Sequence, residues 1–192
     1  MRLFVALDID DGIRRRLAEY VAGLKRLVPD VKWVPAESLH VTLKFIGEFP
    51  EDKLDELKRQ LAMVGGQSFN LFFRSAGFFQ PRSPRVFWVG IEAGHELAAL
   101  AHAVDQATAK LGIPKEERAF TPHLTLARSG SGRPQGARED RNKPKMYELK
   151  ARVETMPPPE FGTMTAREFF LYQSKTLPTG AQYTKLERFP LS

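Results

Sequence analysis

The chain has 192 residues, of which 42% are hydrophobic and 27% charged, a balance that excludes a fibrous or disordered protein and predicts a globular one. It contains no cysteine, which excludes a disulfide scaffold. Its formal net charge of +6 favours a polyanionic partner such as nucleic acid, although a merely basic protein explains charge alone equally well.

The N-terminal apolar run is too short for a signal peptide, because acidic Asp8 follows within a few residues. No later segment approaches the roughly 18 apolar residues that span a bilayer. We therefore expect a cytoplasmic protein, and we expect a monomer. The run Arg2–Ala6 predicts a first strand.

The first half continues with helical and strand patterns. Apolar residues recur at helical spacing from Ile13 to Leu27, and a second helix is predicted over Glu51–Val64, between Pro50 and a Gly-Gly pair. The apolar run Ser38–Leu43 between them predicts a strand. A further strand is predicted over Phe69–Phe73.

The second half shows the same order. A strand is predicted over Arg85–Ile91, a helix from Leu97 to Leu111, and a strand over Thr121–Leu126. Residues 128–144 lack a period and are rich in Gly, Pro and charge, which predicts a long surface loop or a flap over a polyanion. Two last strands are predicted over Phe169–Gln173 and Gln182–Arg188.

Two of the four histidines share one context, His-x-Thr-Leu after a hydroxyl residue. His40 and His123 are separated by a sequence offset of 123 − 40 = 83, and this offset also aligns the first strands and helices of the two halves. The pattern predicts an α+β fold in which residues 1–192 form a single bilobed domain, with two duplicated lobes of mainly antiparallel sheet and outer helices. We expect the active-site cleft between the lobes.

Strand alternation places His40 and Thr42 on one face, and likewise His123 and Thr125, with the leucines facing the core. Two imidazoles can act as general acid and general base, while hydroxyls stabilise anionic oxygens. The set suits cleavage of a phosphodiester. A metal site is disfavoured because each strand offers one good ligand, and no Ser or Cys stands in a nucleophile context.

Other residues near the two motifs are harder to assign. Chance would give roughly 0.2 His-x-Thr motifs in such a chain, so two unrelated core histidines are a poor explanation; His95 and His102 fit ordinary surface positions. Lys44 has the parity to face substrate, whereas strict alternation turns Arg128 toward the core unless the strand bulges after its last leucine. Three aromatic residues are able to stack on a base, although core packing is favoured for each: Phe45, Phe79 and Trp88.

The paired motifs resemble the signature of the 2H phosphoesterases, and the chain is most similar to their bacterial and archaeal branch of RNA 2′,3′-cyclic phosphodiesterases, also called 2′-5′ RNA ligases. The resemblance is carried by segments spread along the chain: Arg2–Ala6, His40–Leu43, Phe45–Glu48, Pro84–Trp88, Phe120–Arg128, Leu171–Ser174 and Tyr183–Leu191. Residues 128–159 depart from the family pattern, which affects the expected binding and specificity for substrate rather than catalysis.

The resemblance implies hydrolysis of a 2′,3′-cyclic phosphate at an RNA end to a 2′-phosphomonoester during RNA processing, without metal or cofactor. It implies that His40 is the proton donor and His123 the proton acceptor. Thr42, Thr125 and Arg128 would bind the substrate. Three alternatives stay open: 2′-5′ ligation by the same site in reverse, hydrolysis of a small cyclic-phosphate nucleotide or a 2′-5′ oligoadenylate, and an RNA-binding module without turnover.

Overall fold

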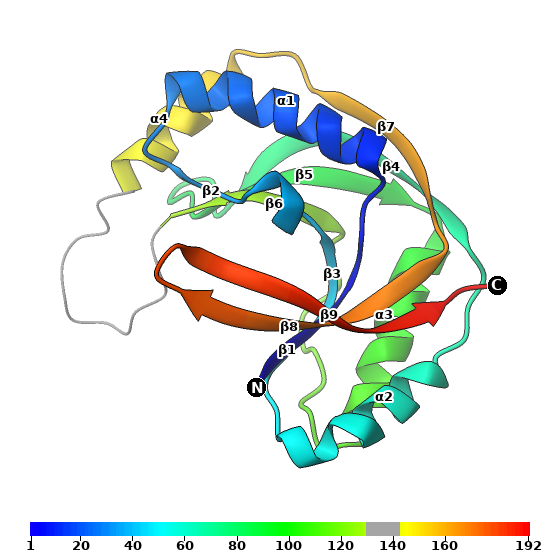
Figure 1. The fold of residues 1–192 in the computed structure, drawn as a ribbon. Coiled ribbons are helices and arrows are strands. Elements are labelled where there is room, and N and C mark those ends of the chain that lie inside the picture. Colours follow the sequence, from blue (N-terminus) through cyan, green and yellow to red (C-terminus); the bar gives the residue numbers. More distant parts are fainter. Residues whose placement is uncertain (130–142) are drawn as a thin grey trace.

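The computed structural model describes residues 1–129 and 143–192 (Figure 1). Its elements follow in this order: β1 (Arg2–Leu7), α1 (Asp11–Leu27), β2 (Lys32–Trp33), the 3-10 turn η1 (Ala36–Ser38), β3 (Val41–Glu48), the 3-10 turn η2 (Glu51–Lys53), α2 (Leu54–Ala62), β4 (Phe69–Phe79), β5 (Val86–Ala93), α3 (His95–Ala109), β6 (His123–Arg128), α4 (Lys143–Glu154), β7 (Glu160–Ala166), β8 (Glu168–Leu177) and β9 (Gly180–Pro190).

The strands form two antiparallel sheets, and each sheet carries one of the two motif strands. The first has the order β3-β1-β8-β9 and the second the order β2-β6-β5-β4-β7. β3 and β6 are not paired with each other, but they lie in contact across the join of the two sheets. The two motifs therefore face each other from different sheets.

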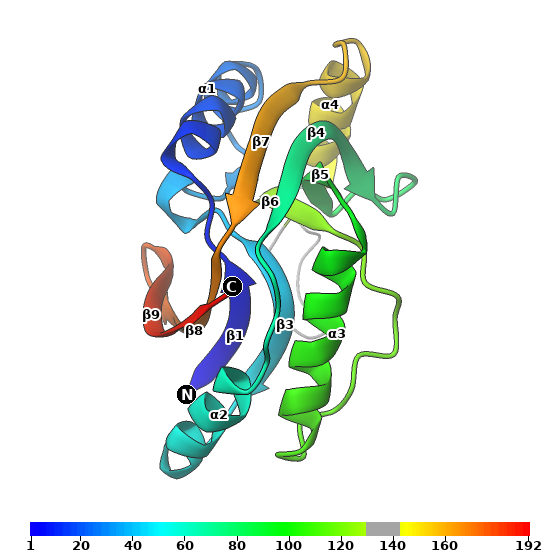
Figure 2. The same ribbon diagram turned by 90° about the vertical axis from the view of Figure 1, so that its right-hand side faces the viewer.

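The helices cover the outer faces of the sheets. α1 packs on β7 and α4 on β4, both in the second sheet, while α3 packs on β3 of the first sheet and on α2. Both ribbon views place α1 and α4 at one end of the molecule and α2 and α3 at the other (Figures 1 and 2). No helix in residues 1–129 or 143–192 is long and apolar enough to cross a membrane.

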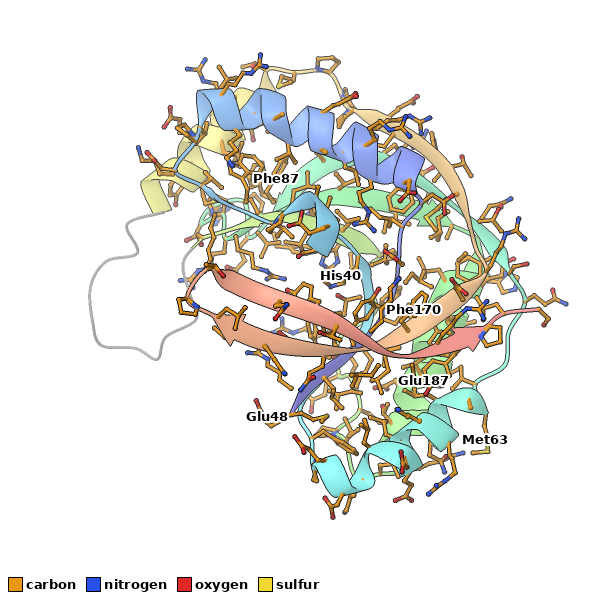
Figure 3. The ribbon with its side chains drawn as sticks, viewed as in Figure 1. His40, Glu48, Met63, Phe87, Phe170 and Glu187 are labelled. Atoms are coloured by element: carbon orange, nitrogen blue, oxygen red, sulfur yellow. The ribbon has the colours of Figure 1, made fainter. Side chains whose placement is uncertain are left out.

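In the described residues a large apolar core lies between helices and sheets, and a small separate cluster includes Phe4 and Tyr172. Phe87 of β5 is fully buried and its ring packs near Tyr20 of α1, beneath that helix (Figure 3). Met63, just past the end of α2, is by contrast 65% exposed. Both sheets pack against their helices through this core, so the strands that carry the motifs are fixed on the face opposite the site.

The predicted α+β class with two antiparallel sheets is confirmed, and each predicted helix and strand is present within a few residues. Three helices or strands were missed, among them the two-residue strand β2. α4 begins inside the segment predicted as a loop, and β7 was not predicted at all. The remainder of that loop, residues 130–142, lies outside the described residues.

The missed strand β7 has a broken alternation. Phe161 is an extra residue between Gly162, opposite Phe73, and Glu160, opposite Arg74. Gly162 has a φ of +100°, a backbone region that favours glycine. Because this bulge shifts the side-chain phase within a short strand, the period-two signal is lost.

Candidate active site

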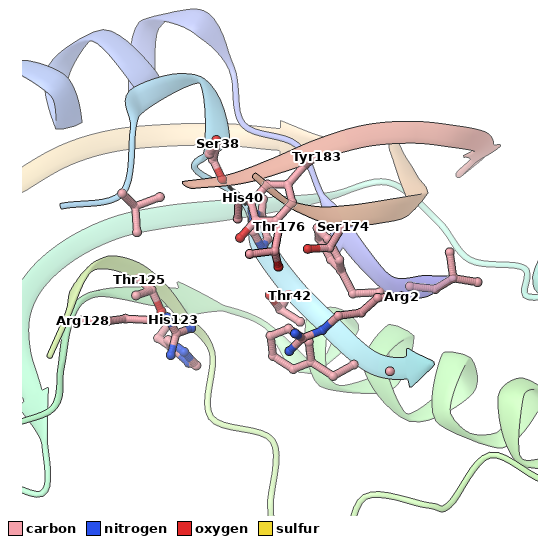
Figure 4. Close-up of a pocket in the computed structure, with 16 residues that line it drawn as sticks. Arg2, Ser38, His40, Thr42, His123, Thr125, Arg128, Ser174, Thr176 and Tyr183 are labelled. Atoms are coloured by element: carbon pink, nitrogen blue, oxygen red, sulfur yellow. Dashed lines mark hydrogen bonds between the residues drawn. The ribbon is translucent and has the colours of Figure 1, made fainter. Parts of the chain in front are cut away.

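A cavity of about 480 Å³ opens between the two motif strands (Figure 4). It contains all five predicted site residues: His40, Thr42, His123, Thr125 and Arg128. Thr42 lies on β3 and His40 immediately precedes that strand, while the other three lie on β6, on the opposite side of the cavity. Side chains from the two halves of the sequence thus meet across one space.

A β-bulge in β6 brings Arg128 into this cavity. Thr125 and Ala127 lie opposite successive residues of β5, so Leu126 is an extra residue. Leu126 and Ala127 are both fully buried, and the next side chain, Arg128, returns to the cavity face. Strict alternation predicts the opposite face for Arg128, and the bulge removes that conflict.

An equivalent bulge in β3 corrects two predictions. Thr42 and Lys44 lie opposite successive residues of β1, so Leu43 is the extra residue. Lys44 consequently points away from the cavity and is only 5% exposed, so the predicted parity, which placed it beside His40 and Thr42, is wrong. Phe45 lines the cavity and is 60% exposed, so the core packing expected for it is also wrong.

Both imidazoles are held in the same way. Nδ1 of His40 lies 2.7 Å from the carbonyl oxygen of Ser38, and Nδ1 of His123 lies 2.8 Å from that of Thr121. A carbonyl oxygen only accepts, so each Nδ1 carries the proton and donates it. Nε2 of each ring is left free for proton exchange with a ligand in the cavity.

Aromatic rings support the two histidines. His40 lies over Phe4, with ring centroids 4.8 Å apart, and meets the edge of Tyr183 at 5.3 Å. His123 makes an edge contact with Phe79 at 4.8 Å. Phe79 and Trp88, the other two aromatic residues considered for base stacking, do not line the cavity in the described part of the chain. Trp88 instead packs against Gly77, where a Cβ atom would lie 2.6 Å from the indole ring.

The environment lowers the pKa of both histidines. Burial is the main cause for each ring, because it disfavours the charged imidazolium, and the positive charge of Arg128 lowers both values further. The carbonyl bonds from Ser38 and Thr121 act in the opposite direction. Two imidazoles with pKa values lowered from 6.5 can each gain and lose a proton on the acid side of pH 6.5.

The chain is similar to proteins of a known family. It matches a family model described as LigT like Phosphoesterase, over residues 7–88 and again over residues 89–183. The chain belongs to this family. The predicted membership of the 2H phosphoesterases is thereby confirmed, and so is the predicted enzyme class, a hydrolase acting on phosphodiester bonds.

Relatives of this LigT-like phosphoesterase align end to end. An RNA 2′,3′-cyclic phosphodiesterase of Archaeoglobus fulgidus is 37% identical, covering 98% of this chain and 99% of that protein. One of Methanothermobacter thermautotrophicus is 34% identical, covering 100% and 99%. The crystal structure of E. coli LigT complexed with 3′-AMP has a TM-score of 0.78 and 29% identity, covering 100% of this chain and 98% of that one.

The LigT-like site includes residues that sequence reasoning missed. Arg2 of β1 and the hairpin residues Ser174, Thr176 and Tyr183 also line the cavity. They come from the first strand and from the last hairpin, at opposite ends of the chain, and no motif links them. The only signal was that the strings Arg2–Ala6, Leu171–Ser174 and Tyr183–Leu191 carry the family resemblance.

A charged group behind His40 was also missed. Asp8 accepts from Arg14 Nη2 at 2.6 Å and from Lys185 Nζ at 2.5 Å. Arg14 Nη1 in turn donates to the carbonyl oxygen of Ala36, at 2.6 Å, in the turn that presents Ser38 to His40. This LigT-like protein therefore positions His40 through an ion-paired layer that the helical pattern of Arg14 did not reveal.

The described residues contain no group of three or more His, Asp or Glu side chains arranged to hold a metal ion. The prediction that the chemistry needs no metal and no cofactor stays a prediction.

Proposed function

We propose that this protein is an RNA 2′,3′-cyclic phosphodiesterase that opens the cyclic phosphate at an RNA end to a 2′-phosphomonoester without a metal ion. One observation carries the proposal: two imidazoles, each fixed through Nδ1 by a backbone carbonyl, share a cavity with two threonines and an arginine. The names of the relatives and the 3′-AMP complex of E. coli LigT support the substrate class.

In the proposed reaction His123 is the proton acceptor. Its Nε2 takes a proton from water as the water oxygen attacks phosphorus. The bond from phosphorus to the 3′ oxygen breaks, and Nε2 of His40 gives its proton to that oxygen. The phosphate stays on the 2′ oxygen. One water is consumed, and the two histidines exchange protonation states before the next turnover.

The remaining polar residues of the site stabilise the negative charge of the phosphate. Thr42, Thr125 and Arg128 stabilise the phosphate oxygens as negative charge builds up in the transition state. Arg128 contributes a fixed positive charge and a planar set of donors that match phosphate geometry. Because imidazoles supply both proton transfers and these three side chains supply the charge stabilisation, the scheme needs no metal ion.

The proposal extends to the organisation of the chain, as one bilobed domain over residues 1–192 with an internal repeat. Its support is that the bulges at Leu43 and Leu126, and the carbonyls of Ser38 and Thr121, keep the same sequence offset as the two histidines. A monomer should unfold in one calorimetric transition with equal calorimetric and van't Hoff enthalpies. Two separate transitions would contradict the single domain.

The decisive experiment is product identification. An oligonucleotide ending in a 2′,3′-cyclic phosphate is incubated with the protein in EDTA, and the product is identified by mass and by its chromatographic retention beside 2′-phosphate and 3′-phosphate standards. A 2′-phosphomonoester is expected. His40→Ala and His123→Ala should each lower kcat by about 10²–10⁴-fold, whereas His102→Ala, an exposed histidine on α3, should not.

The competing functions give different results in the same assay. A requirement for divalent metal, or full activity in both histidine variants, would overturn the proposal. Salt-sensitive RNA binding without turnover would indicate a binding module instead. Joining of the cyclic end to an added 5′-hydroxyl oligonucleotide, faster than hydrolysis, would indicate that the same acid and base work in the direction of 2′-5′ ligation.

A further inference from the structure

The cavity extends well beyond the two histidines. Arg2 stands four residues before Ala6 on β1, and Ala6 lies opposite Thr42. At about 3.3 Å per residue, Arg2 is about 13 Å along the strand from the motif. It nevertheless lines the same cavity as His40. Arg128 therefore enters the cavity beside the second motif, and Arg2 enters it from a strand position well beyond the first motif.

Two hydroxyl groups accompany Arg2. Ser174 of β8 lies directly opposite Arg2 in the sheet, and Thr176 follows two residues later on the same face. Both line the cavity. A guanidinium with neighbouring hydroxyls is a donor set that suits a phosphate group.

The guanidinium of Arg2 is not neutralised by a carboxylate of the described residues. Glu48 is its neighbour across the strands, but this carboxylate lies 3.6 Å from the N-terminal amine. The ion pairs within residues 1–129 and 143–192 do not include Arg2. Figure 4 shows the Arg2 side chain directed toward the middle of the cavity. Its charge is thus available to a ligand.

An apolar surface lies between the strand position of Arg2 and the first motif. Phe4, which is 3% exposed, lies between Arg2 and Ala6 on the same face of β1. Phe45 of β3 lies opposite it, with ring centroids 6.2 Å apart, and supplies the exposed part of this surface. Phe45 is 60% exposed in the cavity. The order of chemistry along the cavity is cation, aromatic surface, cation, which matches the order of phosphate, nucleoside and phosphate in an RNA strand.

We propose that Arg2, with Ser174 and Thr176, forms a subsite for the phosphodiester on the 5′ side of the terminal nucleotide, so that the enzyme prefers an oligonucleotide end to a mononucleotide. This inference rests on the proposed function. It excludes a small cyclic-phosphate nucleotide as the preferred substrate.

The test compares three substrates with the wild-type protein: adenosine 2′,3′-cyclic phosphate, the dinucleotide ApA with a 2′,3′-cyclic end, and the same dinucleotide with a neutral methylphosphonate linkage. The charged dinucleotide should have a kcat/KM about tenfold or more above the other two, the size of one charge-assisted hydrogen bond. The methylphosphonate arm needs no variant, so a folding defect cannot obscure the result.

The variant Arg2→Gln then tests whether Arg2 causes the preference for the charged dinucleotide. The ratio of kcat/KM for the charged dinucleotide over the mononucleotide should fall to about one. Lys175→Gln is the matched control, because Lys175 lies between Ser174 and Thr176 on β8, carries the same charge, and does not line the cavity in the described structure. This variant should keep the wild-type ratio.

A fourth substrate, adenosine 2′,3′-cyclic phosphate with a 5′-phosphate, separates the two sources of the anion. A gain for this nucleotide without a gain for the dinucleotide would overturn the assignment to RNA. Equal rates on the charged and neutral linkages, or an unchanged ratio in Arg2→Gln, would overturn the subsite while leaving the proposed function intact. Failure of the wild-type protein on all four substrates would instead overturn the proposed function.

Discussion

Lys44 and Asp105 form a buried ion pair that joins the strand of the first motif to the segment before the second. Lys44 Nζ donates to Asp105 Oδ1 at 2.6 Å and to the carbonyl oxygen of Pro114 at 2.7 Å. The same carboxylate oxygen accepts the backbone N–H of Glu116 at 3.1 Å. The segment from Pro114 leads to Thr121, whose carbonyl oxygen accepts the hydrogen bond from His123. The ion pair therefore anchors the segment before His123 to β3.

Removal of one partner should destabilise the fold. In Asp105→Ala the Lys44 side chain, which is 4% exposed, loses its carboxylate partner, and the free energy of unfolding should fall by about 3–5 kcal/mol. Urea denaturation at pH 7 measures this. The double variant Lys44→Met with Asp105→Leu, which removes both charges, should recover most of the loss. A change below about 1 kcal/mol in Asp105→Ala would contradict a well-formed buried pair.

The same pair predicts a loss of stability in acid. Burial alone would raise the pKa of Asp105, but hydrogen bonds from Lys44 and from the Glu116 amide hold it below its ordinary value of 3.8. A carboxyl with a lowered pKa stabilises the fold above that ordinary value, and the contribution is lost as pH falls through the folded-state pKa. The stability difference between wild type and Asp105→Asn should therefore shrink below pH 3.8 and stay level above it.

The two histidines predict a bell-shaped pH profile. One imidazole must be neutral and the other protonated, and the pKa of both is lowered from 6.5 by burial. We expect the maximum of kcat/KM on the acid side of pH 6.5, with two apparent pKa values that belong to the pair. A series of initial rates on a cyclic-phosphate dinucleotide measures it. A profile flat from about pH 5 to 9 would argue against two imidazoles.

Arg128 should affect both rate and pH dependence. Arg128→Gln removes a donor to the phosphate oxygens, and kcat/KM should fall by about 10²–10³-fold. It also removes the positive charge that lowers the pKa of His40 and His123, so the optimum should move to higher pH. Arg59→Gln, an exposed arginine on α2, should change neither quantity. A loss of rate without a shift in the optimum would place Arg128 away from the imidazoles.

Much of the site could be predicted because its chemistry is local in sequence. Each histidine stands two residues from its threonine and two residues after its carbonyl, so one strand segment carries a whole half-site. The phase of the strands after the motifs was not predictable in the same way. A bulge depends on pairing with a neighbouring strand. The bulge at Leu43 exchanged the expected positions of Lys44 and Phe45, and the bulge at Leu126 turned Arg128 to the cavity face.

Long-range contributions to the site left no local pattern. Arg14 belongs to α1 and has the periodicity of an exposed helical residue, yet it holds the turn before His40. Arg2 and Ser174 meet only because β1 pairs with β8 from the other end of the chain. α4 was missed for a different reason: its buried residues Met146 and Leu149 have helical spacing, but they follow a stretch without any period.

A variant of Asp8 should shift the pH optimum of kcat/KM in the direction opposite to that of the Arg128 variant. Burial lowers the pKa of His40, and the carboxylate of Asp8 partly offsets this by raising it; Asp8 has no such effect on His123 among the causes of its shift. Asp8→Asn should therefore lower the pKa of His40 further and move the optimum of kcat/KM to lower pH.

The Asp8 variant needs two controls, because Asp8 also binds Arg14 and Lys185. Circular dichroism should show an unchanged fold. Lys185→Gln removes a positive partner and leaves the carboxylate, so its optimum should not move to lower pH. If Asp8→Asn and Arg128→Gln shifted the optimum in the same direction, the two charges would not act on the histidines through their fields, and the rates would report a displaced His40 instead.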